Sequence, residues 1–300
     1  MKKANQDLNS IFAVAEEMIK DKGEDCFYYD SADDKFIIAS MDGCGGSGSK
    51  KYENYSGKSG AYIASRAVCG GVKTWFCESG NGSELNDYIH KALNVCKKYA
   101  DKGGRILGSL SKDFPTTAAI ITGSFSANKI DAECFWAGDS RCYMLDAVGL
   151  HQLTEDDLDG QDAMSNLTED GVMTNVINAS TSFEVHSKKL SFEKPCILLT
   201  ATDGCFGYLR SPMEFEHLLV DSLIRSKSIL EWKMILNHRM FDVTGDDYTL
   251  CVAVCGFKDF DKIRSYYAKR CAYISERYIN STADINALWE VYKKDYSKYL

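Results

Sequence analysis

The chain has 300 residues, 45% of them hydrophobic, so it can bury a core large enough for cooperative folding in one large domain or two small ones. Its 43 acidic residues outnumber 35 basic ones and give a net charge of −8, which argues against a nucleic-acid partner. The N-terminus carries no signal-peptide core and no apolar run reaches transmembrane length, so we expect a cytoplasmic protein with no membrane association.

Twelve cysteines are spread singly along the chain, mostly within apolar runs, and no Cys-x-x-Cys pair occurs. Small buried hydrophobic residues in a reducing compartment explain this distribution better than a disulfide framework or a zinc site.

The first third of the chain combines a lead-in, a hairpin and two helices. Residues 8–20 carry apolar side chains at helical spacing and predict a short helix or an irregular lead-in. Residues 26–29 and 36–41 predict the two strands of a hairpin. Helices are then expected over 58–78 and 84–101.

From residue 116 onwards the sequence pattern changes from helical spacing to short runs typical of strands. Strands are expected over 117–122, 131–137, 142–145, 183–186 and 196–201. Helices near 212–222 and 228–239 then precede a last strand over 248–254. Strands, a helix pair, more strands and then helices favour a mainly antiparallel α+β protein over regular βαβ alternation.

The tail, residues 259–300, differs from the rest because it holds seven of the 17 tyrosines. Four apolar positions share one helical face, and the capping-box pattern from Ser281 to Asp284 predicts the start of a second helix. We therefore expect a domain over 1–258 and a Tyr-rich helical extension over 259–300, packed either on the domain or on a partner.

Two apolar runs end in Asp-Gly pairs, Asp42-Gly43 and Asp203-Gly204. A carboxylate at the end of a buried strand is costly unless a cation or a set of donors lies there. Asp25, Asp139 and Asp246 also border expected strands. Any one of these is typical of a turn or cap, but together they indicate a metal site. Carboxylates without His or Cys ligands suit Mg²⁺ or Mn²⁺.

Segments of this chain occur in an order that resembles the metal-dependent protein phosphatase family (protein phosphatase 2C type, bacterial-like). The matching segments are 24–25, 41–46, 115–118, 137–141, 153–154, 202–204 and 245–249, and the resemblance covers roughly residues 20–256. It implies a β-sandwich of two antiparallel sheets flanked by helices (αββα), with a binuclear Mn²⁺ or Mg²⁺ site at one edge.

The resemblance also implies roles for individual residues. The ligands of the two ions would be Asp25, Asp42, Gly43 (through its carbonyl), Asp203 and Asp246, with Asp42 bridging the ions. Glu24 would hold a metal-bound water, and Asp139 would contact a third, weaker metal. Lys20 stands at the position of a phosphate-binding Arg, and a Lys binds phosphate as a point charge only. No nucleotide or other organic cofactor is expected.

Two further positions depart from the family pattern. Cys44 stands where many members have a histidine, a proposed general acid, so the proton donor would be a metal-bound water. Gly207 stands where an acid would share the third metal.

The implied activity is hydrolysis of phosphoserine or phosphothreonine in a protein by a metal-activated water, and the expected partners are a Ser/Thr kinase or its targets. The alternative is a catalytically weak pseudophosphatase that acts as a protein-binding module. The segment 154–171, with seven acids and no base, is either a solvated loop or a substrate-selecting flap beside the site.

Overall fold

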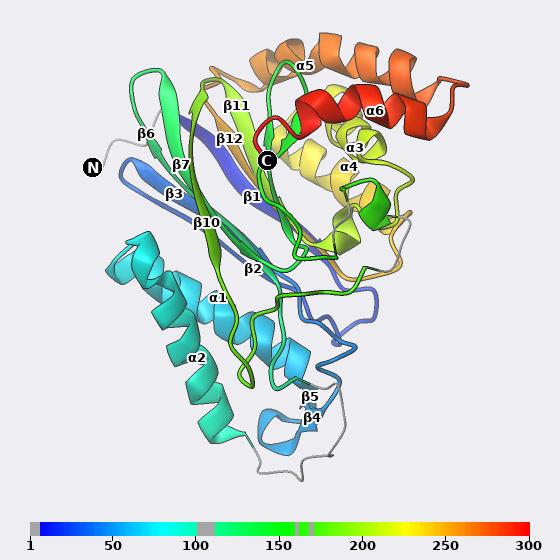
Figure 1. The fold of residues 1–300 in the computed structure, drawn as a ribbon. Helices are drawn as coiled ribbons and strands as arrows, with labels where there is room; N and C mark the ends of the chain where they lie inside the picture. The colour runs from blue at the N-terminus through cyan, green and yellow to red at the C-terminus, as the bar shows by residue number, and fades with distance from the viewer. Residues whose placement is uncertain (1–6, 101–111, 160–161, 168–170) are drawn as a thin grey trace.

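Two antiparallel sheets form the centre of the molecule in the computed structural model, which describes residues 7–100, 112–159, 162–167 and 171–300 (Figure 1). The first sheet has the strand order β1 (Leu8–Glu16), β12 (Tyr248–Cys255), β11 (Cys196–Ala201), β8 (Arg141–Leu145) and β9 (Leu150–Gln152). The second has the order β10 (His186–Glu193), β7 (Lys129–Ala137), β6 (Ala118–Phe125), β3 (Lys35–Met41) and β2 (Cys26–Ala32). A small ribbon pairs β4 (Lys51–Tyr52) with β5 (Lys58–Ser59).

Helices cover the outer face of each sheet, which gives four layers (Figure 1). The second sheet is covered by α1 (Gly60–Glu78) and α2 (Leu85–Tyr99). The first is covered by α3 (Pro212–Arg225), α4 (Ile229–Phe241), α5 (Phe260–Ile274) and α6 (Ile285–Tyr296). None of the helices in the described part of the chain is both long and apolar enough to cross a membrane. The predicted α+β sandwich of two antiparallel sheets flanked by helices is confirmed.

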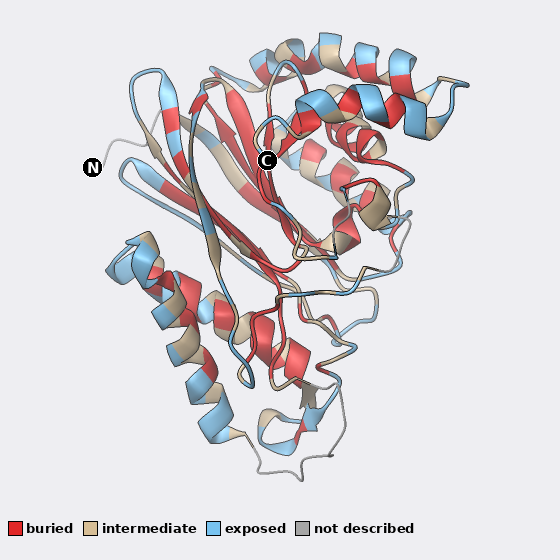
Figure 2. Ribbon diagram, viewed as in Figure 1, coloured by how far each residue is buried: buried red, intermediate tan, exposed pale blue. Residues whose placement is uncertain are grey.

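Buried residues form three separate layers (Figure 2). Ile38 and Leu198 lie in the layer between the two sheets, where Ser40 and Thr200 are also joined by a hydroxyl–hydroxyl hydrogen bond of 2.8 Å. Trp75 belongs to the second layer, which lies under α1 and α2. The third layer lies under α3 to α6. Because central strands are covered on both faces, all eight residues of β12 are buried.

Most predicted elements are confirmed with shifted boundaries. The hairpin of β2 and β3, the helices α1 to α4 and the strands β6, β7, β8, β11 and β12 all lie where the sequence pattern placed them. The strand predicted over 183–186 is shifted, because β10 begins only at His186 and then pairs with β7 as far as Glu193. The helix predicted from Ser281 begins one turn later: Asp284 is the cap, and its side chain accepts from the Asn286 and Ala287 amides.

The predicted helix or irregular lead-in over 8–20 is wrong, because residues 8–16 form strand β1. This strand pairs with β12 along its length. Phe12 and Val14 face the layer under the helices, whereas Ala13 faces the layer between the sheets. A strand buried on both faces loses the apolar–polar alternation that identifies a strand, so its apolar residues happened to match helical spacing.

The tail helices pack against the rest of the chain and continue its core. Tyr267 of α5 donates its hydroxyl to the carbonyl of Leu145 in β8 at 2.7 Å. Glu216 of α3, fully buried, accepts from Arg270 of α5 at 2.9 Å and from the hydroxyl of Tyr292 in α6 at 2.5 Å. One buried carboxylate therefore joins three helices. The division of the chain at residue 258 stays a prediction.

Replacing Glu216 with Ala should lower the free energy of unfolding by about 3–5 kcal/mol, because it leaves a buried guanidinium without its counter-charge. Urea denaturation measures the change. The matched control is Asp261→Ala, which removes the exposed partner of Arg264 on the same tail helix and should cost less than about 1 kcal/mol. Equal losses in the two variants would contradict the role given to Glu216.

Candidate metal site at one end of the sandwich

The five aspartates predicted from the sequence all stand at strand ends. Asp25 precedes β2 and Asp42 follows β3, while Asp139 follows β7. Asp203 follows β11, and Asp246 lies two residues before β12. In an antiparallel pair the start of one strand lies beside the end of the next. The pairs β2–β3 and β11–β12 therefore bring these residues to one end of the sandwich.

Electrostatic contacts show that the aspartates face one another. The carboxylates of Asp25, Asp203 and Asp139 all act electrostatically on that of Asp42. Asp246 acts in turn on Asp203. The structure thus brings together all five carboxylates that the sequence analysis selected.

Burial, followed by mutual repulsion, raises the pKa values of these carboxyl groups. The pKa rises to about 7 for Asp25, to about 8 for Asp139 and to about 6 for Asp203, and that of Asp42 lies well above its usual range. For Asp25, the hydroxyl of Thr202 acts in the opposite direction by hydrogen bonding to the carboxylate. The ionised cluster is therefore costly without a positive charge in its midst.

The donor set fits an oxygen-ligated divalent cation. Asp25 Oδ1 and Asp139 Oδ1 are buried and have no hydrogen-bond partner, although buried carboxylate oxygens are normally satisfied. Oxygen donors alone are the ligands that Mg²⁺ and Mn²⁺ take. As they stand, no three His, Cys, Asp or Glu side chains within the described ranges are arranged so that they could hold a metal ion.

Two threonine-bearing segments hold the metal-site aspartates in place. Thr202 donates its hydroxyl to Asp25 Oδ2 at 2.9 Å and accepts from the Thr249 amide at 2.9 Å, so the ends of β11 and β12 carry Asp25. The carbonyl of Asp42 accepts from the Thr116 hydroxyl at 2.6 Å and the Thr117 amide at 2.8 Å. No structural role was predicted for any of these four threonines.

Asp247 also positions the site, although no role was predicted for it. Its two carboxylate oxygens accept from the backbone amides of Met18 at 2.9 Å and Glu24 at 2.8 Å. It thereby ties the loop that carries Glu24 and Asp25 to the turn before β12. The Asp-Asp pair at 246–247 was visible in the sequence, but nothing local to it indicated these distant amides.

Glu24 lies against the start of α1. Its carboxylate accepts from the hydroxyl of Ser59, the N-cap residue of that helix, and its carbonyl accepts from Arg66 at 3.2 Å. Burial raises the pKa of Glu24, and the neighbouring carboxylates of Asp247 and Asp246 raise it further. Glu24 thus lies beside the cluster, and its role of holding a metal-bound water stays a prediction.

The remaining predicted residues differ in how close they come to the acids. Gly43 approaches α1 so closely that a Cβ would lie 2.6 Å from the carbonyl oxygen of Ala61, so only glycine fits there. Cys44 is partly buried, and burial together with the Asp42 charge raises the pKa of its thiol. Lys20 is exposed in the turn Ile19 to Lys22, and none of the described contacts joins it to the five aspartates.

A cavity of about 330 Å³ borders the cluster, and Asp139, Asp203 and Gly207 line it. Arg141, also in the lining, forms a bidentate pair with Asp156 in which both side chains are at most 3% exposed. The solvated-loop interpretation of segment 154–171 is therefore wrong at Asp156. Residues 160–161 and 168–170 of that segment lie outside the described residues.

Another part of the segment is held by the tail: Asp162 accepts from the indole N–H of Trp289 in α6 at 2.8 Å. A hollow of about 930 Å³ lies between these two residues and the loop at Gly207 and Tyr208. The same two loop residues also line the cavity beside the aspartates.

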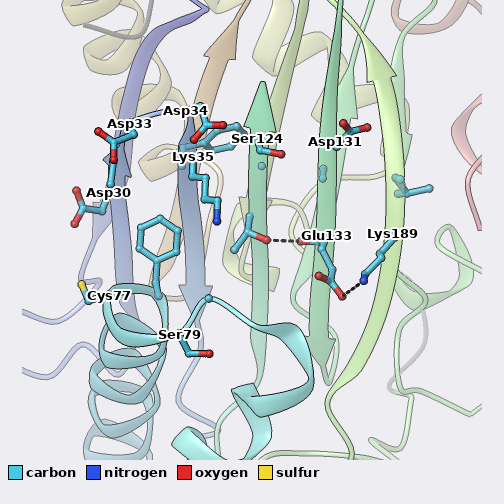
Figure 3. Close-up of a pocket in the computed structure, with 18 of the residues that line it drawn as sticks. Asp30, Asp33, Asp34, Lys35, Cys77, Ser79, Ser124, Asp131, Glu133 and Lys189 are labelled. Atoms are coloured by element: carbon cyan, nitrogen blue, oxygen red, sulfur yellow. Dashed lines mark hydrogen bonds and ion pairs between the residues drawn. The ribbon is translucent and has the colours of Figure 1, made fainter. Parts of the chain in front are cut away.

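A separate hollow of about 1030 Å³ lies at the opposite end of the same strands, near the start of β3 and the end of α1 (Figure 3). Asp131 and Glu133 of β7 face the acids of the β2–β3 turn across it, and Glu133 pairs with Lys189 at 4.0 Å. None of the five metal-site aspartates lines it, so it is not part of the candidate site.

Without divalent ions, the melting temperature should fall as the pH rises from about 5 to about 8. The unfolded carboxyls titrate near their ordinary values, whereas Asp203, Asp25 and Asp139 keep their protons up to about pH 6, 7 and 8 when folded. The stability present at low pH is therefore lost as the pH rises through the folded pKa values. Mn²⁺ should raise the melting temperature more at about pH 8 than at about pH 5, because protons compete with the ion. A flat metal-free profile would contradict the proposed burial of these charges.

Asp247→Ala should weaken Mn²⁺ binding by about 10–100-fold, because it releases the loop that presents Glu24 and Asp25. Isothermal titration calorimetry measures the dissociation constant. Asp242→Ala, at an exposed aspartate that pairs with His238 at 3.5 Å, serves as the control and should bind Mn²⁺ like the wild type. Unchanged affinity in the Asp247 variant would show that this residue does not position the site.

Comparison with known proteins gives matches among solved structures only. No protein-family model and no curated protein matches the chain. A bacterial serine phosphatase matches with a TM-score of 0.60 and 18% identity, over 84% of this chain and 99% of its own. The catalytic domain of the serine/threonine phosphatase PstP, solved with two manganese ions, matches with a TM-score of 0.56 and 14% identity, over 83% and 98% of the two chains.

Stp1, a serine/threonine phosphatase from Staphylococcus aureus, matches with a TM-score of 0.56 and 17% identity, over 86% of this chain and 100% of its own. At such identities the similarity shows that the folds are alike, and it does not show a shared catalytic activity. It confirms at the level of fold the resemblance drawn from the ordered sequence segments. The chain therefore has the fold of the bacterial protein phosphatase 2C-type serine/threonine phosphatases.

Proposed function

We propose that the chain is a metal-dependent phosphatase that hydrolyses phosphoserine and phosphothreonine in proteins. The observation that carries the proposal is the convergence of five strand-end aspartates at one end of this fold, with buried carboxylate oxygens that lack a protein partner. The similar PstP structure contains two manganese ions, which supports the same use of the site here.

Asp25, Asp42, Asp203 and Asp246 would hold two divalent cations, Mn²⁺ or Mg²⁺, together with the carbonyl of Gly43. When bound, such ions lower the pKa of water and neutralise charge on a phosphoryl group. The chain's own contribution is to collect the carboxylates and to hold them against their mutual repulsion. Asp139 would contact a third ion, and Gly207 supplies no second carboxylate for it.

Glu24 would orient a water molecule, because its carboxylate is held by Ser59 at the edge of the cluster. Lys20 would attract the phosphate group from the rim. The turn that carries it is fixed from the other side, since Lys58 Nζ donates to the carbonyl of Asp21 at 2.7 Å. Lys20 acts only as a point charge, so we expect it to affect substrate binding more than turnover. Cys44 does not replace the cationic acid that a histidine would provide, because a protonated thiol is neutral. Its raised pKa keeps the thiol protonated at pH 7.

Two observations favour a second function, a protein-binding pseudophosphatase. Lys20 is exposed without a described contact to the five aspartates, and Gly207, which lines the cavity beside Asp139 and Asp203, brings no carboxylate to it. Under that proposal the fold would recognise a phosphorylated protein, such as a Ser/Thr kinase or its target, with little turnover. The two functions differ in whether Mn²⁺ produces hydrolysis.

Hydrolysis of para-nitrophenyl phosphate and of a phosphothreonine peptide tests the enzyme proposal. The wild type should turn over both with Mn²⁺ and neither with a chelator, and Asp203→Asn should lose about 100-fold or more in rate. The control is Asp131→Asn, an equally conservative change in the hollow at the far end of the strands, which should keep full activity. No Mn²⁺-dependent turnover in the wild type would favour the pseudophosphatase. Full activity in the Asp203 variant would refute the site assignment.

A further inference from the structure

Two cysteines lie side by side next to the candidate metal site. Cys26 is the first residue of β2 and directly follows Asp25. Cys69 lies in α1, which packs against β2. Cys69 Sγ donates to the carbonyl of Phe27, the residue after Cys26, at 3.3 Å, and the two thiols interact with each other electrostatically. They are free thiols 43 positions apart in sequence that the packing of α1 on β2 brings close together.

Cys69 belongs to a row of α1 residues whose side chains hydrogen-bond to the backbone around Glu24 and Asp25. Arg66 donates to the carbonyls of Gly23 at 3.1 Å and Glu24 at 3.2 Å, and Ser65 donates to the carbonyl of Glu24. Cys69 continues this row one turn later, at Phe27. The course of the backbone on both sides of Asp25 is thus set by contacts with one face of α1.

The other thiols differ from this pair in accessibility or in contacts. Cys134 and Cys142 also interact with each other, but both are completely buried between the sheets. Cys77 is exposed, and the contact described for it is with the hydroxyl of Tyr28 at 3.9 Å. Cys26 and Cys69 are both partly exposed, so a small oxidant can reach a pair that already lies close together.

We propose that Cys26 and Cys69 form a reversible disulfide on reaction with hydrogen peroxide, and that this bond displaces the Asp25 carboxylate and weakens metal binding. One thiol sulfur attacks the peroxide, the O–O bond breaks, and a sulfenic acid and water form. The second thiol sulfur attacks the sulfenic sulfur, the S–S bond forms, and a second water leaves. The two thiols lose two electrons and two protons in total, and the peroxide is reduced by the same two electrons.

The bond changes the site in two ways. A covalent S–S distance is much shorter than a thiol–thiol contact, so the start of β2 is drawn toward α1. Cys69 also loses the hydrogen that it donates to Phe27. Because Asp25 is joined to Cys26 by one peptide unit, its carboxylate moves relative to Asp42 and Thr202. The disulfide itself does not depend on the proposed activity, whereas its effect on turnover does.

The test treats the full-length protein with hydrogen peroxide, maps disulfides by non-reducing peptide mass spectrometry, and measures Mn²⁺ affinity by calorimetry before and after dithiothreitol. The wild type should show a Cys26–Cys69 peptide and a loss of affinity of about 10–100-fold that dithiothreitol restores. Cys69→Ser keeps a hydroxyl donor for Phe27 and should lose both the cross-link and the sensitivity to peroxide. Cys77→Ser, on the same helix, should behave like the wild type.

Three results would overturn the proposal. The first is the absence of a cross-linked Cys26–Cys69 peptide in the wild type after peroxide treatment, a result that requires no variant. The peptide could form without any change in Mn²⁺ affinity. Peroxide could also weaken Mn²⁺ binding equally in the wild type and in Cys69→Ser, which would place the sensitivity elsewhere. Should Cys69→Ser fail to fold, Cys69→Ala takes its place, and the peptide map of the wild type still decides.

Discussion

Repulsion among the carboxylates at one end of the sandwich is the constraint on which the surrounding structure depends. Five aspartates meet there, and their pKa values are raised because burial and mutual repulsion outweigh the hydrogen bonds and the Arg141 charge that act in the opposite direction. The nearest buried guanidinium, that of Arg141, is already paired with Asp156. The rest of the scaffold holds these groups together through backbone contacts, with Thr202 under Asp25 and Asp247 on the amides before it. The fold thus positions the carboxylates, and under the proposed function a bound cation compensates their charge.

The same constraint explains which features the sequence predicted. Asp42 and Asp203 could be found because each ends an apolar run and is followed by glycine, and both signals are local. The antiparallel pairing of β2 with β3 and of β11 with β12 then brings the strand ends together without further information. The β-sandwich itself was predicted from the resemblance of the ordered segments to the phosphatase family.

What the sequence did not predict depends on distant contacts. Asp247 acts through the amides of Met18 and Glu24, which lie 229 and 223 residues away. For residues 8–16 the sequence predicted a helix or an irregular lead-in, because the pairing partner of this strand, β12, lies at the other end of the chain. Distant parts of the chain also cover both faces of β1. Cys26 and Cys69 were judged one at a time as small buried residues, and only the packing of α1 on β2 shows them as a pair.

The hydrogen bond from Trp289 to Asp162 links the last helix to the rim of the site. Asp162 belongs to the acidic segment whose earlier member, Asp156, lines the cavity beside Asp139 and Asp203. The tail therefore forms part of the wall of the neighbouring hollow, which shares Gly207 and Tyr208 with the cavity beside the aspartates. Under the proposed function, sequence changes in α6 would alter which phosphorylated surfaces fit against that wall while the aspartates stay the same.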